Sequence, residues 1–192
     1  MKRNLKGSLT EQNLLKAFAG ESQAANRYRM YAQQAREDGY EKIAAFFEET
    51  RHNELRHGGI YFGFLQGGEV EITASYPAGV VGTTLRNLEL AAAGEYEEWS
   101  ALYPTFGDVA ESEGFMDIAL KFRMIAAIEK VHEERFRGLY ETLRSEQIFR
   151  KEGETVWRCM ECGFLHIGTS APKKCPVCGY PQAYFEVMSE SY

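Results

Sequence analysis

Four cysteines near the carboxyl end form the most localised chemical feature of the sequence. They occur as two Cys-x-x-Cys pairs, Cys159 with Cys162 and Cys175 with Cys178. Each pair can present two thiolates from one turn, and two pairs complete a tetrahedral cage of four sulfur ligands. Because disulfides are disfavoured in a reducing cytosol, this spacing predicts a metal site. Sulfur ligands alone do not distinguish iron from the zinc of a structural zinc ribbon.

A second set of residues combines carboxylates with imidazoles. The sequence contains Glu54-x-x-His57 and, 75 positions later, Glu129-x-x-His132. Residues three apart lie on one face of a helix, so each pair can bind one metal ion from a single turn. Carboxylate bridges with imidazole ligands suit two iron or manganese ions about 3.5–4 Å apart. The recurrence of the pair therefore predicts a di-metal site.

Further glutamates and two tyrosines extend this set. Glu21 and Glu95 each follow an Ala-Gly dipeptide, and small residues beside a carboxylate favour close helix packing around a buried metal. Glu98 lies one turn after Glu95 and is predicted to be an additional ligand. Tyr28 and Tyr103 lie on roughly the same faces as Glu21 and Glu95, where each phenol can hydrogen-bond a ligating carboxylate. Ordinary packing of the two tyrosine rings is the alternative.

A third Glu-x-x-His pair, Glu49 with His52, is predicted to lie on the surface. It falls five residues before Glu54, about 140° around the helix. Its counterparts at the offset of 75 are Met124 and Ala127, which cannot bind a metal in that way.

Long helices must position these side chains. A helix is expected to begin at Thr10, or at Ser8 with Glu11 as a capping box, and glycines at 39, 67–68 and 114 provide stops. The expected helices span about 10–38, 40–66, 82–113 and 115–147, with an extended connection over 69–79. Two tight turns and one long crossover predict a mainly α, ferritin-like four-helix bundle.

The two halves of this bundle resemble each other. Glu21 aligns with Glu95 at an offset of 74, whereas Tyr28 aligns with Tyr103 at an offset of 75. One extra residue inside a helix usually forms a π-bulge, often at a functional site. We therefore predict a π-bulge between Glu95 and Tyr103, and a kink at Pro104.

The cysteines belong to a separate small module. Residues 153–192 contain three of the five prolines and two short β-type runs, 155–158 and 183–187. A division into residues 1–150 and 151–192 follows from this change in composition. A module of about 40 residues generally needs a metal to fold.

Composition excludes several classes of protein. The 192 residues carry 22 basic and 28 acidic side chains, a net charge of -6, and no cluster of basic residues, which argues against nucleic-acid binding. No apolar run approaches a membrane span, and the basic start lacks the apolar stretch of a signal peptide. The expected location is the cytoplasm.

The combination of these motifs resembles the rubrerythrin family over nearly the whole chain. The resemblance implies a rubredoxin-like iron centre at the four cysteines, with zinc as a possible substitute, and a di-iron site in the bundle. It also implies a non-haem peroxidase that reduces hydrogen peroxide and takes electrons from rubredoxin or an NAD(P)H-dependent reductase. A head-to-tail homodimer is implied too, in which one subunit's four-cysteine iron serves the di-iron site of the other.

The same resemblance assigns roles to the predicted ligands. Glu21 and Glu95 would each bind one iron, and the carboxylates of Glu54 and Glu129 would bridge. His132 would bind one iron, and the other iron would exchange His57 for Glu98 on oxidation. The rival interpretations are a ferritin-like ferroxidase or iron-storage protein with a structural zinc ribbon, and a metal-free interaction bundle with a zinc-ribbon adaptor.

Overall fold

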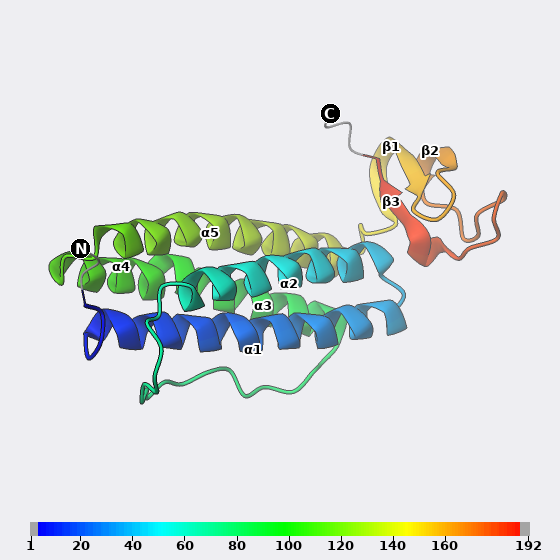
Figure 1. Cartoon of the computed structure of the whole chain (residues 1–192). Helices are drawn as coiled ribbons and strands as arrows, with labels where there is room; N and C mark the ends of the chain where they lie inside the picture. The colour runs from blue at the N-terminus through cyan, green and yellow to red at the C-terminus, as the bar shows by residue number, and fades with distance from the viewer. Residues whose placement is uncertain (1–3, 189–192) are drawn as a thin grey trace.

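A computed structural model describes residues 4–188 and contains an elongated helical bundle with a small β module at one end (Figure 1). The helices are α1 Leu9–Glu37, α2 Glu41–Phe62, α3 Thr84–Glu97, α4 Tyr103–Ser112 and α5 Met116–Arg144. The π-helical segment η1, Glu98–Leu102, joins α3 to α4 without a break. Helix α1 packs on α2, and the α3–η1–α4 rod packs on α5. The predicted ferritin-like four-helix fold is confirmed, with one long crossover running along the bundle from α2 to α3 (Figure 1).

The ends of the helices follow the sequence signals in part. Ser8 caps the start of α1 by accepting a hydrogen bond from the Glu11 amide. Gly39 adopts a left-handed φ of 85° in the turn between α1 and α2. The second helix was predicted to reach about residue 66 but ends at Phe62. Phe64 and Leu65 instead turn and pack against the core at this end of the bundle. The last helix likewise ends at 144 rather than 147, because Glu146 takes a left-handed φ of 58°.

The predicted π-bulge is confirmed in the α3–η1–α4 rod. The five residues from Glu98 to Leu102 are π-helical, and the Tyr103 amide donates to the carbonyl of Glu98, five residues before it. The extra residue therefore lies between Glu95 and Tyr103, where the alignment of the two halves placed it. Pro104 follows at the start of α4, and the kink expected there stays a prediction.

Two aromatic clusters divide the bundle core. One contains Tyr61, Tyr103, Phe106 and Phe122, and the other contains residues such as Tyr28, Phe47 and Phe136. Burial of an aromatic side chain of this kind stabilises the fold by about 1.5–3 kcal/mol. The buried carboxylates and histidines lie between the two clusters, which shield them from water on both sides.

The C-terminal module is a three-stranded antiparallel sheet in the order β2-β1-β3. Its strands are β1 Arg150–Cys159, β2 Leu165–Ser170 and β3 Phe185–Val187, so the division predicted after residue 150 lies at the first residue of β1. Strand β2 was not predicted from the sequence. The buried Trp157 forms the centre of this small core, and its indole N–H donates to the Gly168 carbonyl at 3.0 Å.

The module contacts the end of its own bundle. The ring of Tyr40 stacks on that of Phe149 at 6.0 Å, and the Lys42 ammonium lies 2.6 Å from the Glu186 carboxylate. Within residues 4–188, the structure contains no helix with the length and apolar character that crossing a membrane requires.

Candidate metal centres

The bundle brings together two overlapping groups of metal-ligand side chains. One group is Glu21, Glu54, His57 and Glu129, and the other is Glu54, Glu95, Glu129 and His132. Within each group the ligand atoms all lie within 4.8 Å of one another. Because Glu54 and Glu129 belong to both groups, their carboxylates have the arrangement that a bridged pair of metal ions requires.

Every long helix contributes to this centre. Helix α1 supplies Glu21 and α3 supplies Glu95, while α2 and α5 each supply one Glu-x-x-His pair. All six side chains are buried, and His57 is the most accessible at 5%. The spacing of three residues places each histidine beside the glutamate of its own helix, as the sequence predicted.

The two histidines point their Nδ1 atoms at the shared carboxylates. His57 Nδ1 lies 2.9 Å from Glu129 Oε1 and 3.6 Å from Glu54 Oε2. His132 Nδ1 lies 2.7 Å from Glu129 Oε2 and 3.2 Å from Glu54 Oε1. Each half of the centre therefore presents one imidazole nitrogen to both bridging carboxylates.

These buried atoms lack ordinary hydrogen-bond partners. The Nδ1 atoms and the carboxylate oxygens lie close together, but among residues 4–188 no contact with hydrogen-bond geometry is found for either Nδ1 atom, for either oxygen of Glu54 and Glu129, or for Oε2 of Glu21 and Glu95. Buried polar atoms are nearly always paired in native proteins, so a cluster of this size calls for another partner. Carboxylate and imidazole ligands suit iron, and two bound cations would satisfy the whole set. The residues present therefore fit a di-iron centre.

The electrostatics of the ligand set point the same way. Burial, followed by repulsion from Glu54, raises the pKa of Glu95 to about 8, and burial also raises the pKa of Glu21 well above its usual range. Burial lowers the pKa of His57, but contacts with Glu129 and Glu54 outweigh it and raise this pKa to about 9. Similar contacts raise the pKa of His132 to about 12. The pocket thus stabilises positive charge.

We expect the metal-free protein to lose stability as the pH rises from about 4.5 to about 9. The folded state keeps the Glu95 proton up to about pH 8, whereas the unfolded chain releases it near 4.5. His57 likewise keeps its proton up to about 9 instead of 6.5. Since the folded state binds more protons across this range, its free energy of unfolding falls, by an amount on the order of a few kcal/mol. Denaturant unfolding of chelator-treated protein at pH 5.5 and 8.5 measures the change.

Two controls accompany that measurement. Glu95→Gln removes the Glu95 contribution, so the metal-free variant should lose less stability over the same range. Iron-loaded protein should instead gain stability with pH, because metal ligands bind in their deprotonated forms. Stability of the metal-free protein that stays constant or rises between pH 5.5 and 8.5 would contradict this electrostatic account.

The two tyrosines that were predicted to support the ligands each donate a hydrogen bond to a glutamate in the other half of the internal repeat. The Tyr28 hydroxyl on α1 donates to Glu95 on α3, and the Tyr103 hydroxyl at the start of α4 donates to Glu21 on α1 at 2.5 Å. Each tyrosine therefore holds the glutamate of the opposite half. Both phenols are completely buried, and burial raises their pKa values well above 10, so they remain donors.

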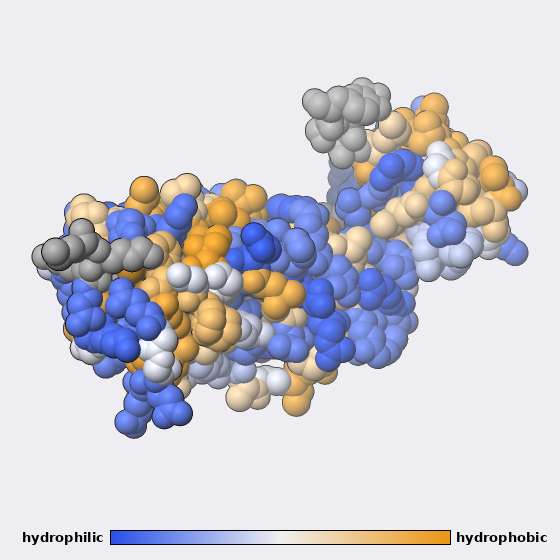
Figure 2. Space-filling view, in the orientation of Figure 1, coloured by the Kyte–Doolittle hydropathy of each residue, from blue (hydrophilic) through white to orange (hydrophobic). Residues whose placement is uncertain are grey.

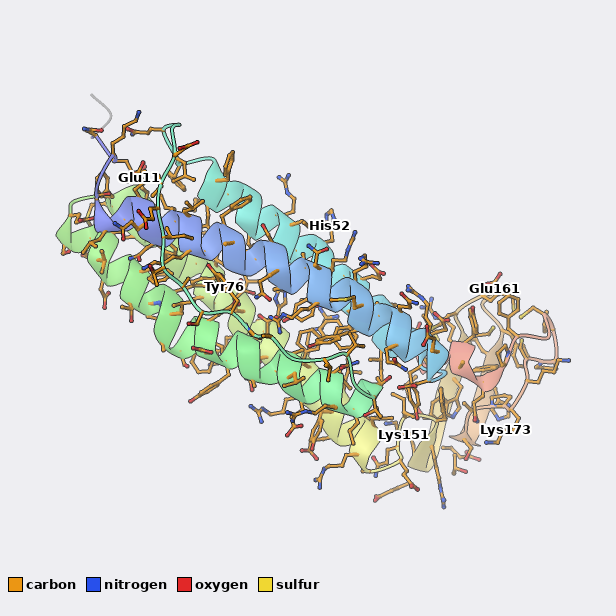
Figure 3. All side chains as sticks on the ribbon, turned by 90° about the horizontal axis from the view of Figure 1, so that it is seen from below. Glu11, His52, Tyr76, Lys151, Glu161 and Lys173 are labelled. Carbon is orange, nitrogen blue, oxygen red and sulfur yellow. The ribbon has the colours of Figure 1, made fainter. Side chains whose placement is uncertain are left out.

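Within the described part of the chain, Glu98 belongs to neither group of ligand atoms, but burial and repulsion from Glu95, Glu129 and Glu54 raise the pKa of its carboxyl well above the usual range. It is the first residue of η1 and is half-buried. Its side chain lines a cavity of about 260 Å³ between α1, η1 and the long connection, beside Tyr103 and Arg27. The connection lines this cavity with Tyr76 (Figure 3), whose hydroxyl donates to the Lys16 carbonyl at 2.8 Å.

The pair predicted to lie on the surface has no place in the centre. His52 is exposed and points outward from α2, and Glu49 accepts a hydrogen bond from Arg135 at 2.7 Å (Figure 3). Sequence reasoning missed two residues beside the ligands. Asn53 Oδ1 lies 3.3 Å from His132 Nε2, and Tyr61 is buried one turn after His57. The helical spacing of Tyr61 from His57 was the available signal.

The four cysteines form the second centre. The Sγ atoms lie 3.7 Å apart between Cys159 and Cys178, and also between Cys162 and Cys175, with all four within 4.8 Å. Glycines at 163 and 179, each with φ of 78°, allow the tight turn after each pair. Cys162 is exposed, whereas Cys159 and Cys175 are buried. Burial opposes ionisation of Cys175, but the amides of Cys178 and Val177 lower its pKa to about 6. This cage fits a single metal ion bound by four thiolates.

Known proteins match this chain along its length. The family model described as Rubrerythrin matches residues 12–140, and the one described as Rubrerythrin, rubredoxin-like domain matches residues 157–186. Rubrerythrin of Porphyromonas gingivalis is 50% identical over 192 residues, which cover 100% of this chain and 96% of that protein. Rubrerythrin of Nitratidesulfovibrio vulgaris is 45% identical over 97% of each protein.

Solved structures of related proteins have the same ferritin-like fold as this chain. Fully reduced, all-ferrous nigerythrin aligns with a TM-score of 0.64 and 33% identity, covering 97% of this chain and 89% of that one. Bacterioferritin of Desulfovibrio desulfuricans aligns with a TM-score of 0.63 over 72% of this chain and 81% of that one, but at 22% identity it shows the fold alone.

Proposed function

Because the chain belongs to the rubrerythrin family, we propose that it is a cytoplasmic non-haem di-iron peroxidase that reduces hydrogen peroxide to water. In this proposal its role is defence against oxidative stress. The observation that carries the proposal is the pair of ligand groups sharing Glu54 and Glu129, whose buried atoms have no other partners among residues 4–188.

The side chains of both groups would hold the iron ions. Glu54 and Glu129 would serve both ions, and Glu21 with His57 and Glu95 with His132 would complete the two halves. A ferrous pair supplies two electrons together, which allows an O–O bond to be reduced without release of a hydroxyl radical. The chain's contribution is to hold the ligands in place through the phenols of Tyr28 and Tyr103 and to exclude water with the two aromatic clusters.

Electrons would reach the bundle through iron in the four-cysteine module. The exposed Cys162 brings one sulfur ligand to the surface, where a donor such as rubredoxin or an NAD(P)H-dependent reductase can approach. Lys42, which anchors the module through Glu186, lies 12 residues before Glu54 on α2. At 1.5 Å per residue, the anchor is roughly 18 Å along the helix from the ligands. This separation supports delivery from the module of a second subunit.

A homodimer, head-to-tail in this proposal, also has support on the bundle surface. Apolar side chains are exposed at helical spacing along α5, at Met116, Leu120, Met124, Ile128 and Val131. Figure 2 shows apolar patches on the bundle among hydrophilic residues. Extended apolar patches on a protein surface commonly mark interfaces. A monomeric mass by analytical ultracentrifugation would contradict the homodimer.

Glu98→Ala is expected to slow peroxide turnover about 10- to 100-fold while two iron ions remain bound to the bundle. The reason is that Glu98 lies outside both ligand groups and lines the cavity beside Tyr103, from which its carboxylate would take the place of His57 as a ligand in the oxidised protein. Steady-state peroxide consumption and metal analysis of the variant provide the two measurements.

Glu97→Ala is the matched control for this variant. Glu97 precedes Glu98 and is exposed, so its removal should leave turnover close to that of the unsubstituted protein. Unchanged turnover in Glu98→Ala would exclude the exchange of ligands. Loss of iron from that variant would instead show that Glu98 is a permanent ligand.

The ferroxidase or storage alternative makes a different spectroscopic prediction. A zinc ribbon is colourless, whereas ferric iron bound by four thiolates absorbs visible light. Metal analysis with a visible spectrum of the oxidised protein therefore separates the two proposals. Three irons per chain with a red colour support the peroxidase, and two irons with one zinc and no red colour support the alternative.

A further inference from the structure

Tyr61 carries a buried hydroxyl that the function proposed above does not use. The residue is completely buried on α2, and its hydroxyl has no hydrogen-bond partner in the described part of the chain. It follows His57 by four residues and Glu54 by seven, so all three lie on one face of the helix. Its ring packs against Phe122 at 4.9 Å and against Tyr103 at 5.5 Å.

The internal repeat shows what packing alone requires at this position. The offset of 75 that relates His57 to His132 relates Tyr61 to Phe136. Phe136 packs against Tyr28 at 5.3 Å and 54°, and Tyr61 packs against Tyr103 at 5.5 Å and 59°. The two ring contacts therefore have nearly the same geometry, yet of the two equivalent residues Tyr61 carries a hydroxyl and Phe136 does not. Packing of the core requires an aromatic ring at both positions, but it does not require the hydroxyl of Tyr61.

An unpaired hydroxyl in a protein interior is unfavourable, because its hydrogen bonds to water are lost without replacement. The neighbouring phenol of Tyr103 is already engaged with Glu21, and that of Tyr28 with Glu95. A phenol is protonated at neutral pH and can donate. Of these three phenols, only that of Tyr61 is free to donate, and it lies beside the half of the centre that contains Glu21 and His57.

We propose that Tyr61 is a substrate-binding residue, whose hydroxyl donates a hydrogen bond to a hydroperoxide or small anion bound at the Glu21–His57 half of the centre. This assignment rests on the proposed peroxidase function and adds a substrate contact to it. It also distinguishes the two halves, because Phe136 offers no donor at the equivalent position.

Azide is the probe for this contact, titrated into oxidised, iron-loaded, full-length protein and followed by visible absorbance. Tyr61→Phe keeps the ring that Phe136 shows to be sufficient for packing. It should weaken azide binding roughly 10- to 100-fold, as expected for a lost hydrogen bond to a charged ligand. The KM for peroxide should rise in the same variant. Tyr140→Phe, which removes a phenol eight residues beyond His132, should change neither quantity.

The stability of the metal-free protein separates binding from packing. Tyr61→Phe removes an unpaired buried hydroxyl, so its thermal midpoint should equal or exceed that of the unsubstituted chain. A lower midpoint, with azide affinity and KM unchanged, would show a packing role and overturn the proposal. Failure of azide to bind the unsubstituted protein would overturn it as well. If azide binding weakens as expected but no variant or parent consumes peroxide, the contact stands and the peroxidase function fails.

Discussion

Glu129→Gln should abolish both iron positions of the bundle and reduce peroxide consumption by at least about a hundredfold. Glu129 belongs to both ligand groups, and its two oxygens lie 2.9 Å and 2.7 Å from the Nδ1 atoms of His57 and His132. A neutral amide cannot bridge two cations, and loss even of partners outside the ligand set costs about 10–100-fold in metal affinity or activity. Metal analysis after iron loading, together with peroxide consumption, measures the effect.

Glu133→Gln is the matched control for Glu129→Gln. Glu133 is also buried on α5, but it pairs with Arg137 and lies outside both ligand groups of residues 4–188. The control should retain two irons in the bundle and nearly full activity. If Glu129→Gln also retained both irons, the shared carboxylate would not be a bridge, and the interpretation of the two overlapping groups would be wrong.

Cys175→Ser should reduce donor-driven peroxide turnover by at least about a hundredfold while leaving the iron ions of the bundle in place. Cys175 is one of the two buried cysteines of the four-thiolate cage, and a module this small generally needs its metal to fold. In the proposed mechanism every electron from the donor passes through that cage. Chemically reduced protein should still react once with peroxide, because the bundle ligands are unchanged.

Val177→Ser provides the control within the same loop. Val177 lies between Cys175 and Cys178, and its side chain is 68% exposed, so the cage should form and turnover should persist. Full donor-driven turnover in Cys175→Ser, with the red colour lost, would show that electrons reach the bundle by another route.

Much of the bundle was predictable because its signals are local and periodic. The two Glu-x-x-His pairs are buried on α2 and α5, as their spacing predicted. The glycines at 39 and 114 lie in the turns that end the preceding helices. The change of offset from 74 to 75 predicted η1, because one additional residue in a paired helix must be accommodated in its hydrogen bonding.

The features that were missed depend on contacts between distant segments. Helix α2 ends at Phe62 with Gly63 as its C-cap, but the later pair of glycines at 67–68 led to a predicted end near residue 66; the packing of Phe64 and Leu65 on the core favours the earlier end. Strand β2 is defined by its pairing with β1, which starts 15 residues earlier. The hydroxyl of Tyr61 is notable only because its ring packs as Phe136 does in the other half.

In the proposed function, iron held by the four cysteines supplies electrons to a di-iron site that reduces peroxide. The most direct test is to reduce the iron-loaded protein under anaerobic conditions, remove the reductant, and add hydrogen peroxide in small portions. We expect the red absorbance of the ferric four-thiolate centre to return in proportion to the peroxide consumed, with only water formed. Peroxide that persists while the absorbance stays bleached, or that disappears without return of the colour, would contradict the proposed function.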